Sequence, residues 1–192
     1  MESTKTRILK KLLETDGYLS GQELCEQLGV SRTAVWKYMK QLKEEGYEIE
    51  AIQNKGYCLK DVPDVLGESE IKSRLHTRWA GQTLYYYDEI DSTNTQIKRL
   101  AEEDAPHGTL AVADYQSRGK GRRGRAWDSP HGSAIYMSIL FRPEIRPDRA
   151  SMLTLVIGLS VTQAIRSNLG LQAQIKWPND VVLNGKKLVG IL

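Results

Sequence analysis

The sequence predicts a mixed α+β fold in two parts, a small N-terminal unit of three helices and a hairpin and a larger unit of alternating strands and helices. Apolar residues in the first part recur at helical spacing and are interrupted by glycines. A segment containing Pro and Gly then breaks all periodicity, and strand-like and helix-like runs alternate after it. We therefore predict one domain over residues 1–62, a linker over 63–67 and a second domain over 68–192.

The composition is that of a globular protein, with 192 residues of which 40% are hydrophobic and 27% are charged. No run approaches the roughly 18 apolar residues of a membrane span, and the N-terminus has no signal-peptide core. We therefore expect a cytoplasmic protein without membrane contact. Cys25 and Cys58 lie far apart with no further Cys or His at metal-ligand spacing, so no metal site is expected.

Two helices are predicted before residue 30. An apolar stripe over residues 4–15 predicts the first helix, which ends before Gly17. Ser20 and Glu23 have the spacing of a capping box, in which each side chain satisfies a free amide of the other residue. The second helix therefore begins after Ser20, and Gly29 ends it.

A third helix and a hairpin complete the first unit. Ser31 can cap the helix, and Gly46 stops it. Two helices joined by a tight turn containing Gly are typical of the helix-turn-helix motif. Residues 47–60 form two extended runs around Asn54-Lys55-Gly56, a sequence suited to a hairpin turn. The first unit is therefore predicted to be a winged helix.

One face of the predicted third helix is polar and basic, which suits DNA. The candidate DNA contacts on that face are Ser31, Arg32, Thr33, Trp36, Lys37 and Lys40. The wing adds Lys55. An alternative is a protein-docking module with a solvated basic face, because residues 1 to 60 carry ten Lys and Arg against nine Asp and Glu.

The larger unit has a coarser pattern. The predicted helices cover residues 68–75, 92–103 and 149–168, and the predicted strands cover 84–87, 109–115, 134–141, 172–177, 181–183 and 188–192. Asn184-Gly185 is a predicted hairpin turn. The sequence closes on an apolar run without a cap or a turn, so we expect these residues to be part of a longer protein with an incomplete second domain.

A polar loop after the second strand carries the strongest signal for chemistry. Between residues 118 and 125, five positions are basic and the other three are glycine. Backbone amides and cations in such a run suit a carboxylate beside a triphosphate. The glycines also fit a dinucleotide fingerprint, but no helix begins inside the motif, so that reading is rejected. The alternative is a surface loop that binds nucleic acid without sequence preference.

Three other segments are weaker when taken singly. Ser92-Thr93-Asn94 stands where a strand gives way to a helix, which a helix cap alone can explain. Lys176 follows an apolar strand and precedes Trp177-Pro178, where it can reach a phosphate or can be an edge charge. Residues 187–192 are apolar and are predicted to be core, with Gly190 allowing a close approach.

These four segments, in this order, resemble the biotin-protein ligases, and with the winged helix the chain is similar to the ligases that also act as repressors. The resemblance implies a class II synthetase-like mixed α/β catalytic domain. It further implies that biotin and ATP, with Mg²⁺, give biotinyl-5′-AMP, and that a lysine of a biotin carboxyl carrier protein then accepts the biotinyl group. The implied partners are biotin, the carrier, operator DNA and, when ligand is bound, a second copy of the chain.

The resemblance also implies site residues. Biotin or its adenylate is expected to contact Ser92, Thr93, Asn94, Gln116, Lys120, Gly121, Arg122 and Lys176. The adenylate and phosphate loop is expected to use Arg118, Arg123, Arg125, Trp127 and Asn179. Arg122 and Lys176 are the expected catalytic residues. Lys120 stands where the family commonly has Arg, which keeps the charge and loses the bidentate fork.

Charge neutralisation fits this chemistry, because two anions must meet and no side-chain nucleophile is required. The three histidines, His76, His107 and His131, are isolated in the sequence and receive no catalytic role. The rival hypotheses are a lipoate-type ligase, a ligand-sensing repressor without catalysis and a basic interaction module. We expect these 192 residues by themselves to have weak or no ligase activity.

Overall fold

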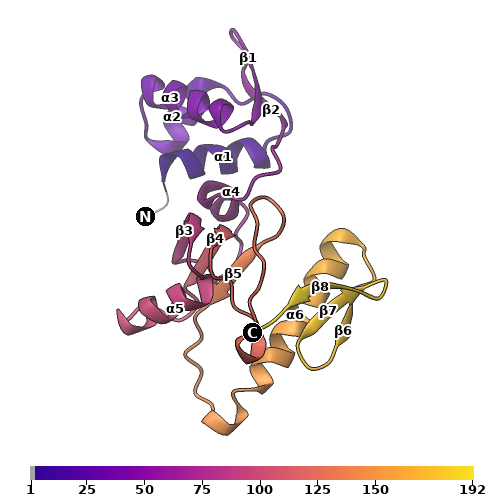
Figure 1. Ribbon diagram of the computed structural model, residues 1–192. Helices are drawn as coiled ribbons and strands as arrows, with labels where there is room; N and C mark the ends of the chain where they lie inside the picture. The colour runs from indigo at the N-terminus through magenta and orange to yellow at the C-terminus, as the bar shows by residue number, and fades with distance from the viewer. Residues whose placement is uncertain (1–2) are drawn as a thin grey trace.

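The computed structural model describes residues 3–192; residues 1–2, which belong to the first predicted domain, lie outside the described part. Figure 1 shows an N-terminal group of helices with a hairpin, a helix below it, a three-stranded sheet, and an arm made of a long helix and a second sheet. The mixed α+β fold predicted from the sequence is confirmed. Within residues 3–192, no helix is both long and apolar enough to cross a membrane.

The first unit is the predicted winged helix. Its elements are α1 (Thr4–Glu14), α2 (Gly21–Leu28), α3 (Arg32–Glu44), β1 (Glu48–Ile52) and β2 (Gly56–Asp61). The helices present their apolar stripes to one core, which also receives residues of the hairpin. The largest fully buried side chains of this core are Ile8, Leu9, Leu24, Val35 and Leu42.

Serine caps fix where the helices of this unit begin. The side chains of Ser20 and Ser31 accept hydrogen bonds from the backbone N–H groups of Glu23 and Ala34, at 3.0 and 3.2 Å. The reciprocal half of the predicted capping box is not formed. The Glu23 carboxylate instead accepts a hydrogen bond from Gln27 one turn further along α2, so the predicted box is wrong and a simple serine cap replaces it.

The wing is anchored to the segment before α2. Leu19 and Tyr57 exchange two backbone hydrogen bonds of 2.8 and 2.9 Å. Asn54 and Gly56 both have positive φ, at 65° and 109°, as the turn sequence predicts. A Cβ on Gly56 would lie 2.2 Å from the carbonyl oxygen of Leu19, so only glycine fits at this crossing.

Helix α4 (Glu68–Ser73) contacts both units. Its Glu70 accepts a hydrogen bond of 2.7 Å from the Tyr47 hydroxyl, and Ser69 lies 3.3 Å from the Thr6 hydroxyl of α1. On the other side, Ile71 packs against a core formed by Leu84, Leu110 and Val112. Helix α4 is therefore packed against both units and connects them.

Replacing Tyr47 by phenylalanine is expected to lower the free energy of unfolding by about 1–2 kcal/mol, the contribution of a hydrogen bond to a charged acceptor. Burial and the Glu70 hydrogen bond raise the pKa of Tyr47. A raised folded-state pKa contributes stability below the unfolded pKa of about 10, and that contribution is lost as the pH rises further. The difference in the free energy of unfolding between wild type and variant, measured by urea unfolding, should have its full value of about 1–2 kcal/mol at pH 8 and should become smaller above pH 10. A difference that does not change with pH would contradict this assignment.

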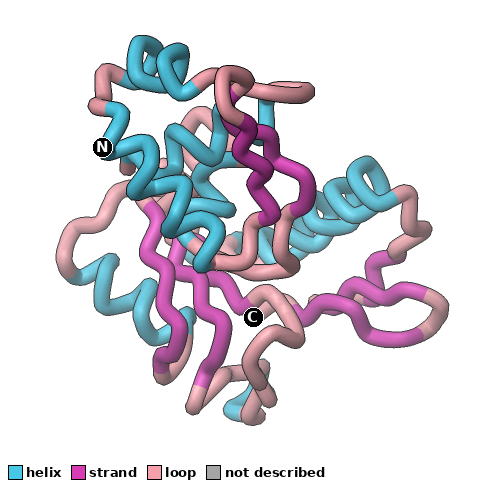
Figure 2. The backbone as a smooth tube through the Cα atoms, turned by 90° about the horizontal axis from the view of Figure 1, so that it is seen from above, coloured by secondary structure: helices cyan, strands magenta, loops and turns pink. Residues whose placement is uncertain are grey.

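The second unit contains a three-stranded sheet of β3 (Leu84–Ile90), β4 (Leu110–Gln116) and β5 (Tyr136–Ile139), in that order. β3 and β4 are parallel, and β5 is antiparallel to β4. Helix α5 (Thr93–Glu102) makes the crossover between the two parallel strands (Figure 2). It buries Ile97 and Leu100 against Ala111. Both parallel strands therefore end at the same edge of the sheet.

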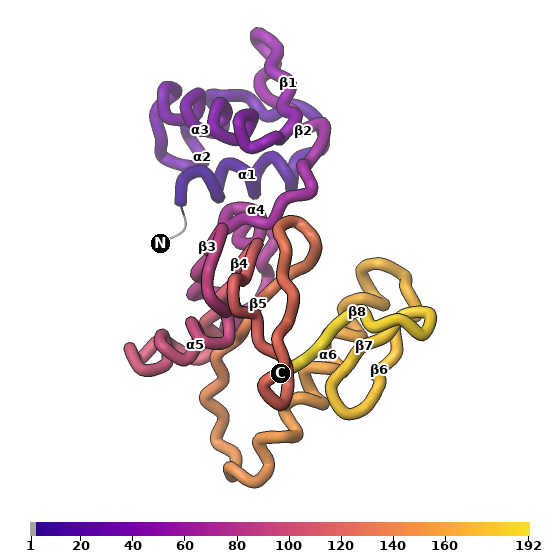
Figure 3. Tube along the Cα trace, viewed as in Figure 1, coloured from indigo at the N-terminus to yellow at the C-terminus, as the bar shows by residue number. Residues whose placement is uncertain are grey.

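The arm consists of α6 (Met152–Leu169) and a separate antiparallel sheet of β6 (Gln174–Lys176), β7 (Asp180–Leu183) and β8 (Lys186–Gly190). Figures 2 and 3 show it lying to one side of the sheet β3-β4-β5. The arm exposes large apolar side chains, among them Val156 at 57% and Trp177 at 77%.

Several predicted boundaries are wrong. β3 continues to Ile90, three residues past the prediction, because its end pairs with β4. The expected strand 188–192 is shifted, since β8 begins at Lys186, two residues after the predicted turn at Asn184. This run was also predicted to be core: Ile191 is buried, but Leu188 is 47% exposed, because β8 belongs to the separate sheet of the arm. Two short 3₁₀ turns, Arg122–Gly124 and Pro147–Arg149, were not foreseen.

Candidate functional site

The candidate site begins where the parallel strands end. Beyond Ile90 and Gln116 the two chain segments stay together, because the N–H of Ser117 donates to the Ile90 carbonyl at 2.9 Å and the N–H of Arg118 donates to the Asp91 carbonyl at 2.8 Å. The predicted contact triplet Ser92-Thr93-Asn94 and the basic loop are therefore neighbours in space. The carboxyl edge of parallel strands is the usual place for ligands in such sheets.

The side chain of Gln116 links the two segments through hydrogen bonds. Its carboxamide oxygen accepts hydrogen bonds from the backbone N–H and the hydroxyl of Thr93, at 2.8 and 3.1 Å, and its amide nitrogen donates to the Ser129 hydroxyl at 2.9 Å. The structure thus brings Gln116 and Thr93 together, but they form hydrogen bonds with each other. The Ser92 hydroxyl is buried and has no hydrogen-bond partner among the described residues, so its hydrogen-bonding capacity is unused.

The segment 117–130, called the cationic loop below, folds back on itself. The backbone N–H of Gly121 donates to Arg125 at 2.8 Å, and that of Trp127 donates to Gly119 at 2.9 Å. Arg123 takes a left-handed conformation at the tip, with φ of 59°. A Cβ on Gly119 would lie 2.3 Å from the Trp127 carbonyl oxygen, so this glycine permits the loop to close at its base.

A pocket of about 760 Å³ lies between this loop and α5, and it is called the cationic pocket below. Asn94 and several glycines of the loop contribute to its wall. The charged residues that line it are Lys98, Arg118, Lys120, Arg123 and Arg125. No Asp or Glu of residues 3–192 belongs to the lining, so the pocket carries unbalanced positive charge and suits a ligand with several negative charges.

The two expected catalytic residues stand outside this lining. Arg122 donates a hydrogen bond of 2.9 Å to the side chain of Asn179, which precedes β7. Lys176 is exposed on β6, and its side chain makes no hydrogen bond or ion pair with any of residues 3–192. The structure therefore unites Arg122 with Asn179 and leaves Lys176 on the arm.

The Trp127 side chain packs the cationic loop against β8 of the arm. A Cβ on Gly190 would lie 2.9 Å from the indole ring, which confirms that Gly190 permits a close approach. The ammonium group of Lys187 stands 4.9 Å from the ring centroid, within the range of a cation–π contact. The ring that the resemblance assigns to adenine is thus covered on one side by β8.

Two functional features were missed from sequence. Lys98 lines the cationic pocket from α5, and the available signal was its position four residues after Asn94 on a predicted helix. The expectation that His131 is isolated is wrong. Its Nδ1 lies 2.7 Å from the Asp114 carboxylate, and its ring stacks on Tyr115 at 4.7 Å between centroids. The hydrogen bond from His131 holds the pKa of Asp114 below its usual value. This pair closes the far end of the cationic loop onto β4.

The predicted DNA-facing surface is solvent-exposed. Its members on α3 and at its cap are all exposed: Ser31, Arg32, Thr33, Trp36, Lys37 and Lys40. A concavity of about 540 Å³ lies between α3 and the wing, with Arg32 and Lys55 in its lining. Lys40 also forms an ion pair of 3.6 Å with Glu44 of the same helix. Helix α3 and the wing thus present cations to a common concavity.

A winged helix joined to an α+β unit, with a cationic loop at the carboxyl edge of its parallel strands, defines the class: a helix-turn-helix module followed by an α+β domain with a positively charged pocket. The chain belongs to the biotin/lipoate A/B protein ligase family, whose model matches residues 86–192. A helix-turn-helix domain model matches residues 4–58.

Relatives agree with this assignment. The bifunctional ligase/repressor BirA of Bacillus spizizenii is 47% identical over 194 residues, covering 100% of this chain and 60% of its own length. BirA of Escherichia coli is 36% identical over 182 residues, covering 94% of this chain and 55% of that protein. Among solved structures, the biotin protein ligase from Aquifex aeolicus in complex with biotin and ATP has a TM-score of 0.51 and 39% identity, over 58% of this chain and 46% of that chain. This chain spans about 60% of the length of the first of these relatives.

Proposed function

We propose that the polypeptide containing this sequence is an ATP-dependent biotin-protein ligase that also represses transcription of biotin synthesis genes. It joins biotin to ATP as biotinyl-5′-AMP, releasing pyrophosphate, and then transfers the biotinyl group to a lysine of a carrier protein. The observation that carries the proposal is the cationic pocket lined by Asn94 and the basic residues of the loop, in a chain that matches the ligase family.

The chemistry follows from charge. The biotin carboxylate must attack the α-phosphate of ATP, and two anions approach each other only if cations neutralise them. Lys120 and Arg122 on the cationic loop are proposed to bind the carboxylate and the phosphoanhydride, with Lys176 reaching the α-phosphate. Asn94 and Ser92 are proposed to hold the uncharged part of biotin. Mg²⁺ would accompany the nucleotide and neutralise part of its phosphate charge.

Two side chains must leave their present partners for this to happen. Arg122 exchanges its hydrogen bond with Asn179 for the ligand, and a bond between neutral and charged partners in an exposed position costs only about 1 kcal/mol to give up. Trp127 is proposed to turn its free face to adenine. The remaining basic residues of the loop, Arg118, Arg123 and Arg125, are proposed to neutralise the phosphates. Closure of the loop would also exclude water from the reactive anhydride.

The proposal is tested by release of pyrophosphate from ATP, measured with the intact polypeptide that carries this sequence. We expect release that depends on biotin and is not produced by lipoate. Release with lipoate alone would make the protein a lipoate-type ligase. Binding of biotin without any release would leave a ligand-sensing repressor without catalysis. Either outcome overturns the proposed ligase activity.

The winged helix, over residues 1–62 with a linker at 63–67, is proposed to bind operator DNA as part of a cytoplasmic homodimer formed with ligand. Support comes from the exposed basic face of α3 and from the concavity that it shares with the wing. The adenylate is proposed to act as corepressor. Residues 68–192 are then the part of the chain that binds ligand.

Replacing Lys37 by glutamine is expected to weaken DNA binding and to lower the slope of log affinity against log salt by about 1, the effect of one lost phosphate contact. The matched control is Lys43→Gln, because Lys43 is an exposed lysine of the same helix that lies outside the predicted contact face. The measurement is fluorescence anisotropy of an operator fragment over a range of salt concentrations. Equal slopes for wild type and Lys37→Gln would remove Lys37 from the interface.

A further inference from the structure

Lys98 is the one cation of the cationic pocket that does not belong to the loop. It lies on α5, whose inner face is fixed by the buried Ile97 and Leu100. A side chain on a packed helix starts from a fixed backbone, so less entropy is lost when it binds than for a side chain on a loop. The backbone of Lys98 is therefore held at the wall of the pocket, while its side chain is exposed to solvent.

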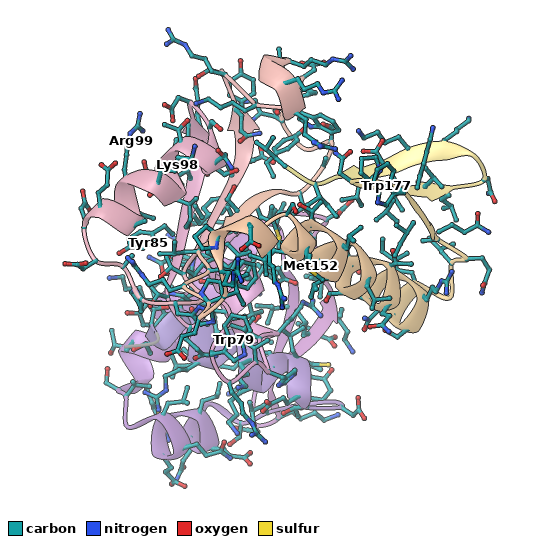
Figure 4. All side chains as sticks on the ribbon, turned by 90° about the horizontal axis from the view of Figure 1, so that it is seen from below. Trp79, Tyr85, Lys98, Arg99, Met152 and Trp177 are labelled. Atoms are coloured by element: carbon teal, nitrogen blue, oxygen red, sulfur yellow. The ribbon has the colours of Figure 1, made fainter. Side chains whose placement is uncertain are left out.

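The neighbouring Arg99 has the same charge, but it is paired with a carboxylate of the chain. The Arg99 guanidinium donates to the Asp91 carboxylate at 2.8 Å and thereby lowers the pKa of Asp91. Figure 4 labels both side chains on α5. Only Lys98 belongs to the lining of the pocket, and it forms no ion pair with a carboxylate among residues 3–192. Its charge is thus available to a ligand.

The position of Lys98 relates it to the proposed substrates. Asn94 and Lys98 are four residues apart on one helix face, which separates them by about 6 Å along the axis. Asn94 is a proposed biotin contact, so a cation one turn further stands beside biotin rather than on it. The other cations of the lining are Arg118, Lys120, Arg123 and Arg125, and no Asp or Glu side chain of residues 3–192 belongs to it. A chain of phosphates matches this arrangement of charges.

We propose that Lys98 is a binding residue for the polyphosphate of the nucleotide and for the pyrophosphate released from it. This inference rests on the proposed ligase function for the identity of the nucleotide. A lysine suits this role, because its compact charge and three donors accept several phosphate orientations. Helix α5 then contributes to both substrates, through Asn94 to biotin and through Lys98 to the polyphosphate.

The test is calorimetric titration of pyrophosphate, and separately of biotin, into the intact polypeptide and three variants. Lys98→Gln removes the charge, and Lys98→Arg keeps it. Lys186→Gln is the matched control, because Lys186 is an exposed lysine of β8 outside the lining of the pocket. We expect Lys98→Gln to weaken pyrophosphate binding about tenfold, as for one charged contact of about 1.4 kcal/mol. Lys98→Arg should retain most of the affinity, and Lys186→Gln should bind as wild type.

Biotin binding separates this inference from the proposed function. Biotin affinity without nucleotide should be the same in all four proteins, and equal thermal unfolding curves exclude a folding defect. Equal pyrophosphate affinities for Lys98→Gln and Lys186→Gln, or no pyrophosphate binding by wild type, would overturn the role of Lys98. Pyrophosphate binding that depends on Lys98, in a protein that binds no biotin, would support the polyphosphate site and contradict the ligase function.

Discussion

Replacing Arg122 by alanine is expected to lower the rate of biotin-dependent pyrophosphate release by about a hundredfold to a thousandfold, the usual effect of removing one charge-stabilising group from an active site. In the structure its guanidinium donates a hydrogen bond to Asn179, which precedes β7. No carboxylate of residues 3–192 forms an ion pair with it. The proposed task of Arg122 is to balance charge that accumulates as the carboxylate attacks, so the loss should appear in kcat as well as in KM.

Two further variants make the result specific. Arg122→Lys keeps the charge without the bidentate fork and should give an intermediate rate. Arg146→Ala is the control, because Arg146 lies outside the cationic pocket and pairs only with Asp148 near the surface. A rate for Arg122→Ala within about threefold of the control would show that Arg122 is not part of the reaction.

The largest expected loss of stability comes from Gly56→Ala in the wing, about 3 kcal/mol. Alanine at a φ of 109° is strained by about 1–2 kcal/mol, and its Cβ would overlap the backbone of Leu19 and Ser20, which adds a similar cost. Such a loss is a large part of the 5–15 kcal/mol that stabilises an ordinary domain. The measurement is urea unfolding followed by circular dichroism.

Gly17→Ala isolates the contribution of the overlap. Gly17 has nearly the same φ, 103°, and nothing lies within 4 Å of a Cβ placed on it. This variant should therefore lose only about 1–2 kcal/mol from backbone strain. Equal losses for the two variants would mean that the wing moves freely away from Leu19, and the contact between wing and helix would then not stabilise the unit.

The first unit could be read from sequence because its determinants are local. Serine caps, glycine stops and the Asn-Lys-Gly turn each act within a few residues of themselves, and Ser20, Ser31 and Gly56 do what their positions predict. The predicted capping box does not form, because two neighbouring groups compete for the Glu23 side chain. Glu23 can meet either the cap residue or Gln27 one turn on, and the sequence does not rank these two partners.

Contacts across long stretches of chain could not be read in this way. Arg122 and Asn179 are 57 residues apart, and His131 and Asp114 are 17 apart, so no periodicity links the members of either pair. The exposure of Leu188 depends on which sheet β8 joins, and hydrophobicity alone predicted burial. The cationic loop itself was visible, because five basic residues in eight positions are unusual. Its partner Lys98 was not, because one lysine on a helix is normally a solvated residue.

The central claim, that the second unit binds biotin and ATP together, is tested most directly by calorimetric titration of biotin into the intact polypeptide, with and without MgATP, and with lipoate as the control ligand. The account predicts that biotin binds, that MgATP strengthens its binding, that Arg122→Ala weakens it, and that lipoate gives no heat. Heat from lipoate and none from biotin, with the protein shown to be folded, would contradict the account.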